Sequence, residues 1–186
     1  MSEQRKVVVI RGAVMASVFV SLWVWLASLV RRFDPAMGVV LPGWLRAVGL
    51  LLGAAGGATG LTCVFLFLTT GRGTPAPFDP PKVFVATGPY RYVRNPMYVG
   101  GVLALIGAGL AVQSIAILTL EVVFWGLSHL MVVLNEEPAL EKRFGESFLR
   151  YKRRVHRWLP RIPSQEGDAQ PRDAADEAQG GTRTAS

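Results

Sequence analysis

Long apolar runs alternate with short polar segments along the chain. The runs at residues 7–30 and 45–70 are each long enough to supply the roughly 20 apolar residues that cross a hydrocarbon core. Two further runs, 96–112 and 115–134, are separated only by Gln113 and Ser114, which predicts a helical hairpin with a tight turn. The third run is short, so we expect it to be tilted or to meet a thinned bilayer. The pattern predicts an all-α, polytopic membrane protein with about four transmembrane helices.

Basic residues near the start of the chain precede the first apolar run, a pattern that is also typical of a signal peptide. The run is longer than a usual signal peptide core and lacks a clear cleavage site of small residues, so we interpret it as a retained membrane span.

Beyond the fourth run, apolar residues recur every three or four positions with basic residues between them. This spacing predicts a C-terminal amphipathic helix that lies at the membrane interface. The apolar members are Leu140, Phe144, Phe148, Tyr151, Val155 and Trp158. Residues 164–186 are polar and aperiodic, which predicts a disordered tail. We therefore divide the chain into N-terminal membrane helices (1–70), a core of loop, hairpin and amphipathic helix (71–163), and the tail.

Composition and charge support the membrane assignment. The chain is 51% hydrophobic and 18% charged, with a net charge of +7, whereas soluble domains carry about a quarter charged residues. A basic chain can bind nucleic acid, but basic loops beside anionic lipid explain this charge better, so we expect no nucleic-acid partner. Most Lys and Arg would share one side of four spans, and only Arg31, Arg32 and Arg46 fall opposite. This predicts cytoplasmic termini, in the inner membrane of a bacterium.

Glycines recur in the second apolar run. Gly49, Gly53 and Gly57 are spaced by four, and Gly56 and Gly60 form an offset pair. Such spacing lets another helix approach closely. The partner is either a helix of the same chain, which we favour, or the same helix of a second copy in a homodimer.

Two polar groups flank the predicted hairpin. Residues 87–100 combine three tyrosines and two arginines with an Asn95-Pro96 helix start. Pro96 suits the first turn of a helix and Asn95 suits its N-cap. A helix N-terminus beside arginines attracts an anion such as a carboxylate. The alternative is a basic and aromatic anchor at the membrane interface.

The second polar group, Glu136 and Glu137, directly follows the fourth run. Carboxylates at the C-terminal end of a helix oppose its dipole, which indicates a partner such as a cation, an amine or hydroxyls. The alternative is that the acids pair with Arg91, Arg94 or the following basic helix. Because hairpin ends are neighbours in space, both groups converge on one predicted pocket, suited to a zwitterionic amino acid moiety and ribose hydroxyls.

In this order, the motifs resemble the isoprenylcysteine carboxyl methyltransferase and phospholipid methyltransferase superfamily of membrane enzymes. The resemblance covers residues 82–160 and includes Gly88-Pro89-Tyr90, the run 94–100, Glu136-Glu137, Phe144-Gly145 and Tyr151. It implies S-adenosylmethionine as cofactor and a lipophilic or small methyl acceptor, namely a carboxylate, amine or thiol. The cofactor contacts that it implies are Lys82, Val83, Phe84, Val85, Tyr90, Arg94, Asn95, Pro96, Met97, Tyr98, Glu136 and Glu137.

The sequence departs from the family pattern at two informative positions. Asn95 stands where many members have His, and an amide cannot carry a proton at neutral pH. Val132 stands where the eukaryotic carboxyl methyltransferases place an Arg that holds the acceptor carboxylate. This departure argues against prenylcysteine as the acceptor.

One ionisable residue inside the fourth run, His129, lies about two turns before Glu136. Ionisable groups within a span are functional candidates by default, so His129 either serves the acceptor or its proton, or is a satisfied packing residue. Two histidines and one cysteine cannot build a conventional zinc site, so no metal is predicted. Rival functions are an NADPH-dependent sterol-type membrane reductase and a non-enzymatic membrane scaffold.

Overall fold

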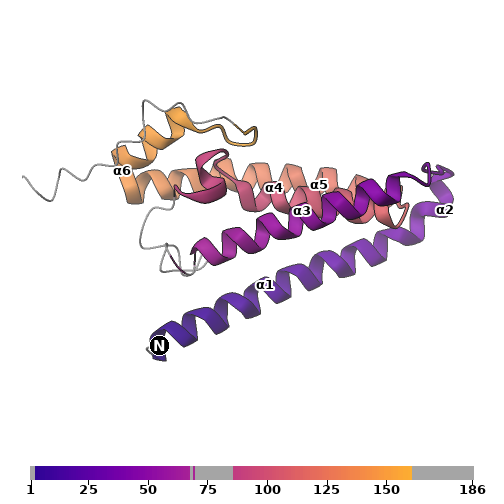
Figure 1. Cartoon of the computed structure of the whole chain (residues 1–186), viewed down its shortest axis with the longest axis horizontal. Helices are drawn as coiled ribbons and strands as arrows, with labels where there is room; N and C mark the ends of the chain where they lie inside the picture. Colours follow the sequence, from indigo (N-terminus) through magenta and orange to yellow (C-terminus); the bar gives the residue numbers. More distant parts are fainter. Residues whose placement is uncertain (1–2, 68, 70–85, 161–186) are drawn as a thin grey trace, which may run out of the picture.

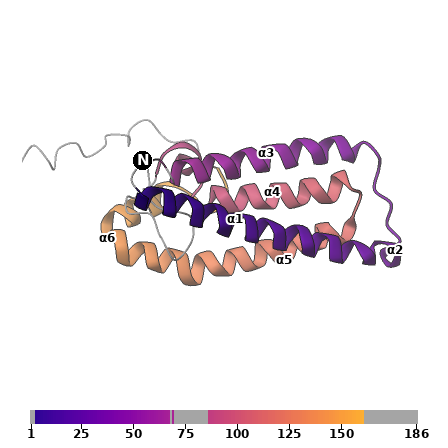
Figure 2. The ribbon, with the colours of Figure 1, turned by 90° about the horizontal axis from the view of Figure 1, so that it is seen from below.

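The protein is described by a computed structural model that covers residues 3–67, 69 and 86–160, with only the backbone for 3–9 and 12. This part of the chain consists of helices and connections, with no strand. The α-helices are α1 (Glu3–Val30), α2 (Asp34–Met37), α3 (Leu45–Leu66), α4 (Pro96–Ala111), α5 (Ile115–Met131) and α6 (Glu137–Arg154). Helices α3, α4 and α5 lie side by side, and α1 diverges from them toward its N-terminus (Figures 1 and 2).

Among the described residues, three segments are long and apolar enough to cross a membrane: Ala13–Met37, Leu45–Leu66 and Ile115–Arg154. Helix α4 is apolar but has 16 residues, about 24 Å at 1.5 Å per residue, against a core of about 30 Å. The prediction of an all-α polytopic membrane protein is confirmed. The third predicted span is the short one, as its sequence indicated.

Helices α3 and α4 pack with their backbones almost in contact. A Cβ added at Gly49 or Gly56 would meet an α4 backbone atom at 2.4 or 2.5 Å, and one at Gly107 would meet the Gly53 nitrogen at 2.3 Å. Packing within the chain is therefore confirmed. The expected spacing of four is wrong for Gly57, which has nothing within 4 Å of an added Cβ. Seven residues make about two turns, so Gly49 and Gly56 share the packed face. The homodimer contact stays a prediction.

The turn between α4 and α5 is tight, as predicted. Gln113 adopts a positive φ of 60°, and the Ser114 side chain caps α5 by accepting the N–H of Ile117 at 3.2 Å. Asp34 accepts the next free N–H, that of Ala116, at 2.9 Å. The turn makes α4 and α5 antiparallel and so brings the start of α4 to the end of α5.

Helix α5 continues into α6 through a π-helical segment, Val132–Glu136. Helix α6 is not the continuous interfacial helix that its periodicity predicted. It is broken at Gly145 (φ 49°, ψ −127°), where the chain turns away from the α5 axis, and it ends at Arg154 (Figure 1). Its apolar residues are nevertheless turned toward the protein: Phe148 is 2% exposed, Val155 just after the helix is 8% exposed, and the other members of the series are partly buried.

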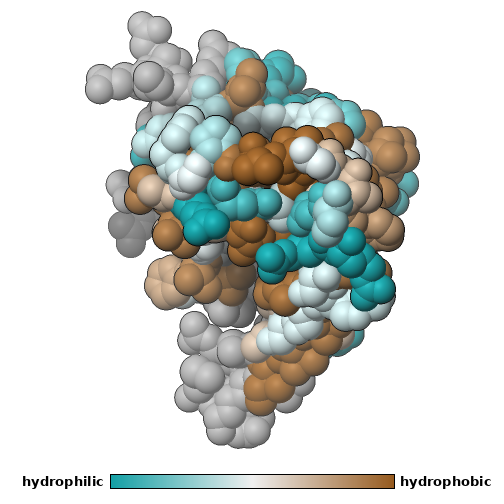
Figure 3. All heavy atoms as spheres, turned by 90° about the vertical axis from the view of Figure 1, so that its right-hand side faces the viewer, coloured by the Kyte–Doolittle hydropathy of each residue, from teal (hydrophilic) through white to brown (hydrophobic). Residues whose placement is uncertain are grey.

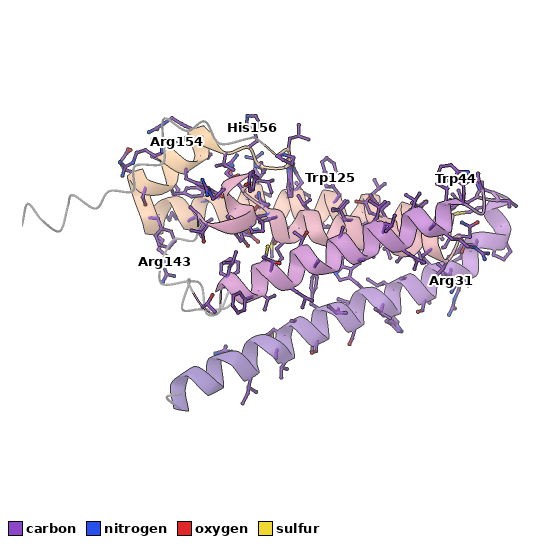
Figure 4. All side chains as sticks on the ribbon, viewed as in Figure 1. Arg31, Trp44, Trp125, Arg143, Arg154 and His156 are labelled. Atoms are coloured by element: carbon purple, nitrogen blue, oxygen red, sulfur yellow. The ribbon has the colours of Figure 1, made fainter. Side chains whose placement is uncertain are left out.

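The two ends of the helix bundle differ in character. Arg143, Arg154 and His156 lie at the end that holds α6, and Arg31 and Trp44 lie at the opposite end (Figure 4). Seen from the α2 end, hydrophilic residues gather between hydrophobic ones (Figure 3). A cavity of about 520 Å³ opens at that end, lined by Ser28, Arg31, Arg32, Asp34, Pro35, Val112 and Gln113. It lies opposite the polar groups that flank the hairpin, so it is no part of the predicted pocket.

Candidate functional site

The two polar groups predicted to converge do meet. The Tyr98 hydroxyl, in the first turns of α4, donates a short hydrogen bond to Glu136 at the end of the π-helical segment. Both side chains are partly buried. The ring of Trp158 lies edge-on to Tyr98 with 6.4 Å between ring centroids. A carboxylate is therefore held in a defined position at the open end of the hairpin, opposite the turn at Gln113 and Ser114.

The two adjacent acids at the end of the π-helical segment have different partners. Glu136 points to Tyr98, whereas Glu137 points to a cluster of cations. Single π-helical turns inside α-helices are rare and occur often at functional sites. Here the wider turn supplies one carboxylate to the candidate pocket and one to the scaffold behind it.

Glu137 is the centre of an ion-pair cluster. Arg157 forms a bidentate pair with it, at 2.7 Å and 2.9 Å, while Arg94 Nη1 lies 2.9 Å and Lys152 Nζ 3.4 Å from its oxygens. The Glu137 side chain is only 8% exposed. Pairing of an acid with Arg94 and the basic helix, the alternative raised by the sequence, is thus what occurs at Glu137.

Arg94 is only partly satisfied by this cluster. Its contact with Glu137 has the distance of an ion pair but not the geometry of a hydrogen bond, and its buried Nε and Nη1 have no hydrogen-bond partner in the described part of the chain. Burial lowers the pKa of Arg94, against the effect of Glu137. The hydrogen bond to Glu137 raises the pKa of Arg157. Buried donors without partners suit an anionic ligand group.

Asn95 occupies the N-cap position of α4 but does not cap it, so that part of the prediction is wrong. Its Nδ2 instead donates to the backbone carbonyl of Arg157 at 3.2 Å, and the Arg94 N–H donates to that of His156 at 2.8 Å. These bonds attach the segment 155–158, hereafter the strap, across the start of α4. Asn95 makes no side-chain cap, so among the described residues the N–H groups of the first turn of α4 can meet an anion.

Tyr90, Pro96 and Met97 lie in packed positions. Tyr90 is 8% exposed, packs with Cys63 and lies edge-on to Phe67 at 5.6 Å. Burial raises the pKa of Tyr90 far above its usual value, and its carbonyl accepts the Tyr151 hydroxyl at 2.7 Å. Met97 packs on the same cluster, and Pro96 is fully buried. Lys82, Val83, Phe84 and Val85 lie outside the described residues.

His129 lies on α5 between two tryptophans. Its ring centroid is 5.7 Å from that of Trp125 and 5.9 Å from that of Trp158, and its Nδ1 accepts the Trp158 indole N–H at 3.1 Å. Val132 is completely buried. Sequence reasoning did not single out Arg157 and used Trp158 only as part of the apolar periodicity. Arg157 contacts Glu137, 20 residues away, and Trp158 contacts His129, 29 residues away. The local sequence pattern contains no signal for contacts at such separations.

Comparisons with known proteins identify a family and three relatives. A sequence model described as phospholipid methyltransferase matches residues 44–147, which extends the resemblance to include α3. The chain is 31% identical over 88 residues to the cobalt-zinc-cadmium resistance protein CzcN of Cupriavidus metallidurans, covering 47% of this chain and 40% of that protein. It is 32% identical over 78 residues to the nickel-cobalt-cadmium resistance protein NccN of Alcaligenes xylosoxydans xylosoxydans, with coverages of 42% and 36%.

A third relative is the protein-S-isoprenylcysteine O-methyltransferase of Schizosaccharomyces pombe. The identity is 30% over 82 residues, which cover 44% of this chain and 34% of that enzyme. The chain therefore spans about 34–40% of the length of these curated relatives. Within the described ranges, no group of three or more His, Cys, Asp and Glu side chains is placed to hold a metal.

Proposed function

The chain belongs to the phospholipid methyltransferase family, and from this premise we propose that it is an integral membrane methyltransferase that uses S-adenosylmethionine. Its acceptor is a lipophilic or small molecule that carries a carboxylate, amine or thiol. The observation that supports this function best is the Tyr98–Glu136 pair, whose neighbour in sequence, Glu137, is paired with Arg94 just before the start of α4.

The charges of these residues suit the two ends of the cofactor. The unpartnered Nε of Arg94 and the uncapped first turn of α4 suit the carboxylate of an amino acid moiety. Glu136 suits an ammonium group or ribose hydroxyls, because an ionised carboxylate only accepts hydrogen bonds. Tyr98 fixes its position. Glu137 is already neutralised by three cations, so its role in this proposal is to hold Arg94 in place.

When bound, the cofactor supplies a methyl group on a sulfonium centre. The protein's part is to bind, orient and exclude water. The strap contributes to this exclusion, since Trp158 packs against Tyr98 and is bonded to His129. An amine acceptor must also lose a proton, whereas a carboxylate or thiolate acceptor needs no base.

Binding measured by calorimetry on the protein purified in detergent tests this function. We expect S-adenosylmethionine to bind, and Glu136→Gln to weaken binding by about 10- to 100-fold, since a hydrogen bond to a charged group is worth about 1.5–3 kcal/mol. Tyr98→Phe should weaken it less. The matched control is Glu146→Gln, because Glu146 is 76% exposed on α6.

Three results would contradict the proposal. Retention of NADPH without binding of S-adenosylmethionine favours the sterol-type reductase. Unchanged binding in both the Glu136 and Tyr98 variants removes the pair from the cofactor site, and no binding of either cofactor favours the scaffold. The acceptor class follows from incubating membranes with methyl-labelled cofactor and identifying the labelled product.

We also propose that both termini face the cytoplasm of a bacterium with the protein in its inner membrane. This orientation agrees with the basic residues of α6 and the strap and would place the Tyr98–Glu136 pair beside the soluble cofactor pool.

A further inference from the structure

His129 combines an ionisable ring with an unusual position. It lies on the apolar helix α5, is only partly buried, and stacks beside Trp125, which is 46% exposed on the outside of the bundle. Figure 4 shows Trp125 projecting away from the neighbouring helices. An imidazole at the boundary between protein and bilayer is costly unless its polar atoms are used.

The hydrogen bond to Trp158 determines which polar atom remains. An indole N–H can only donate, so Nδ1 of His129 must be the acceptor and carries no proton. In a neutral imidazole the proton is then on Nε2. His129 therefore presents an N–H donor at Nε2, and its basic nitrogen is already occupied. This arrangement suits a group that binds an oxygen atom better than one that removes a proton.

The position of Trp158 connects this donor to the candidate site. The indole contacts His129 on one side and Tyr98 on the other, with centroid distances of 5.9 and 6.4 Å. Tyr98 in turn bonds Glu136. The Trp158 ring thus lies between the His129 donor and the proposed cofactor ligands. His129 itself lies on the face of α5 that carries the exposed ring of Trp125.

We propose that His129 binds the methyl acceptor by donating its Nε2–H to an anionic oxygen of the acceptor's polar group, a phosphate or a carboxylate. The Trp125 and Trp158 rings flank this donor and pack on the adjoining hydrocarbon. The acceptor class is therefore an amphiphile that enters from the bilayer along α5. This inference rests on the proposed methyltransferase function and adds how the acceptor is held.

Steady-state methyl transfer by the purified full-length protein tests the proposal, with two probes used separately: phosphatidylethanolamine in mixed vesicles, and a long-chain fatty acid. His129→Phe keeps an aromatic ring but removes the donor, and His129→Gln keeps an N–H donor. We expect His129→Phe to raise the KM of the probe that is methylated at least tenfold, with kcat within about threefold. His129→Gln should recover most of the binding that His129→Phe loses, with a KM at least threefold below that of His129→Phe and the pH profile of the wild type.

A general-base role gives a different pattern, since a catalytic base contributes about 10²- to 10⁴-fold to rate. A fall of kcat of that size in both variants, with loss of the acid limb of the profile, would overturn the proposal. An unchanged acceptor KM in His129→Phe would also overturn it. Methylation of neither probe by protein that binds S-adenosylmethionine would refute the acceptor class, whereas failure to bind this cofactor would refute the function itself.

A spectroscopic measurement checks the tautomer without any activity. In protein labelled with ¹⁵N-histidine, the His129 resonances should show a proton on Nε2 and none on Nδ1. Trp158→Phe removes the indole N–H but keeps a ring, and it should shift the Nδ1 resonance. A proton on Nδ1 in the wild type would contradict the assignment of Nε2 as the donor.

Discussion

Replacing Glu137 by Gln should destabilise the protein strongly, because it leaves the cations around it unneutralised. Glu137 is 8% exposed and Arg94 11%, while Arg157 is 27% and Lys152 36% exposed. Removing one partner of a buried ion pair costs about 3–5 kcal/mol, whereas exposed pairs contribute about 0–1 kcal/mol. Arg94 therefore dominates the loss, since water still screens the other two cations. We expect a cost of about 3 kcal/mol.

The assay is thermal unfolding in detergent, followed by circular dichroism and by tryptophan fluorescence. For a chain of this size, each kcal/mol shifts Tm by about 2–4 °C, so Glu137→Gln should lower Tm by roughly 6–12 °C. Because Arg157 carries part of the strap, the fluorescence of nearby Trp158 should change before the helices unfold. The control is Glu146→Gln, whose 4.0 Å pair with Arg153 is well exposed and should leave Tm unchanged.

A second substitution provides the decisive comparison. Glu137→Leu combined with Arg94→Met removes both buried charges, so the double variant should be more stable than Glu137→Leu alone. If the two losses simply add, the cost does not arise from an uncompensated charge on Arg94, and the reasoning above is refuted.

Two further predictions concern the packing and capping of the helices. Gly107→Leu should separate α3 from α4, because its Cβ would lie 2.3 Å from the Gly53 nitrogen, and the variant should not give a monodisperse, folded protein in size-exclusion chromatography. Gly57→Leu should be tolerated, since an added Cβ there has no described atom within 4 Å, and equal behaviour of the two variants would argue against this packing. Asp34→Ala removes the side chain that accepts the Ala116 N–H and should lower the free energy of unfolding by about 1 kcal/mol. This loss should appear as a Tm lower by roughly 2–4 °C and as faster hydrogen exchange of the Ala116 amide, and an unchanged exchange rate would mean that water replaces the cap.

Several features could be predicted from the sequence because they depend on local properties. The helical segments follow from hydropathy, and the two-residue interruption at Gln113 and Ser114 forces α4 and α5 to be antiparallel. That geometry predicts that the start of α4 meets the end of α5, where the structure pairs Tyr98 with Glu136, 38 residues apart. The short third span also follows from counting apolar residues.

Other features depend on how each helix is rotated about its axis. Glycines spaced by four suggested one packed face on α3, but the helical repeat puts Gly49 and Gly56 against α4 and leaves Gly57 outside. The periodicity after Glu137 identified the buried face of α6 but not the break at Gly145, because a positive φ leaves the apolar pattern intact. A glycine is compatible with both conformations.

By itself, the sequence determined that this is a helical membrane protein, where its helices lie and which ends of the hairpin meet, since hydropathy and connection length act locally. Only the tertiary structure decided which of two adjacent acids can serve a ligand. Glu136 accepts a hydrogen bond from Tyr98, whereas Arg94, Arg157 and Lys152 neutralise Glu137. The direction of a side chain and the charge around it are set by residues distant in sequence, and neither is written in the local pattern.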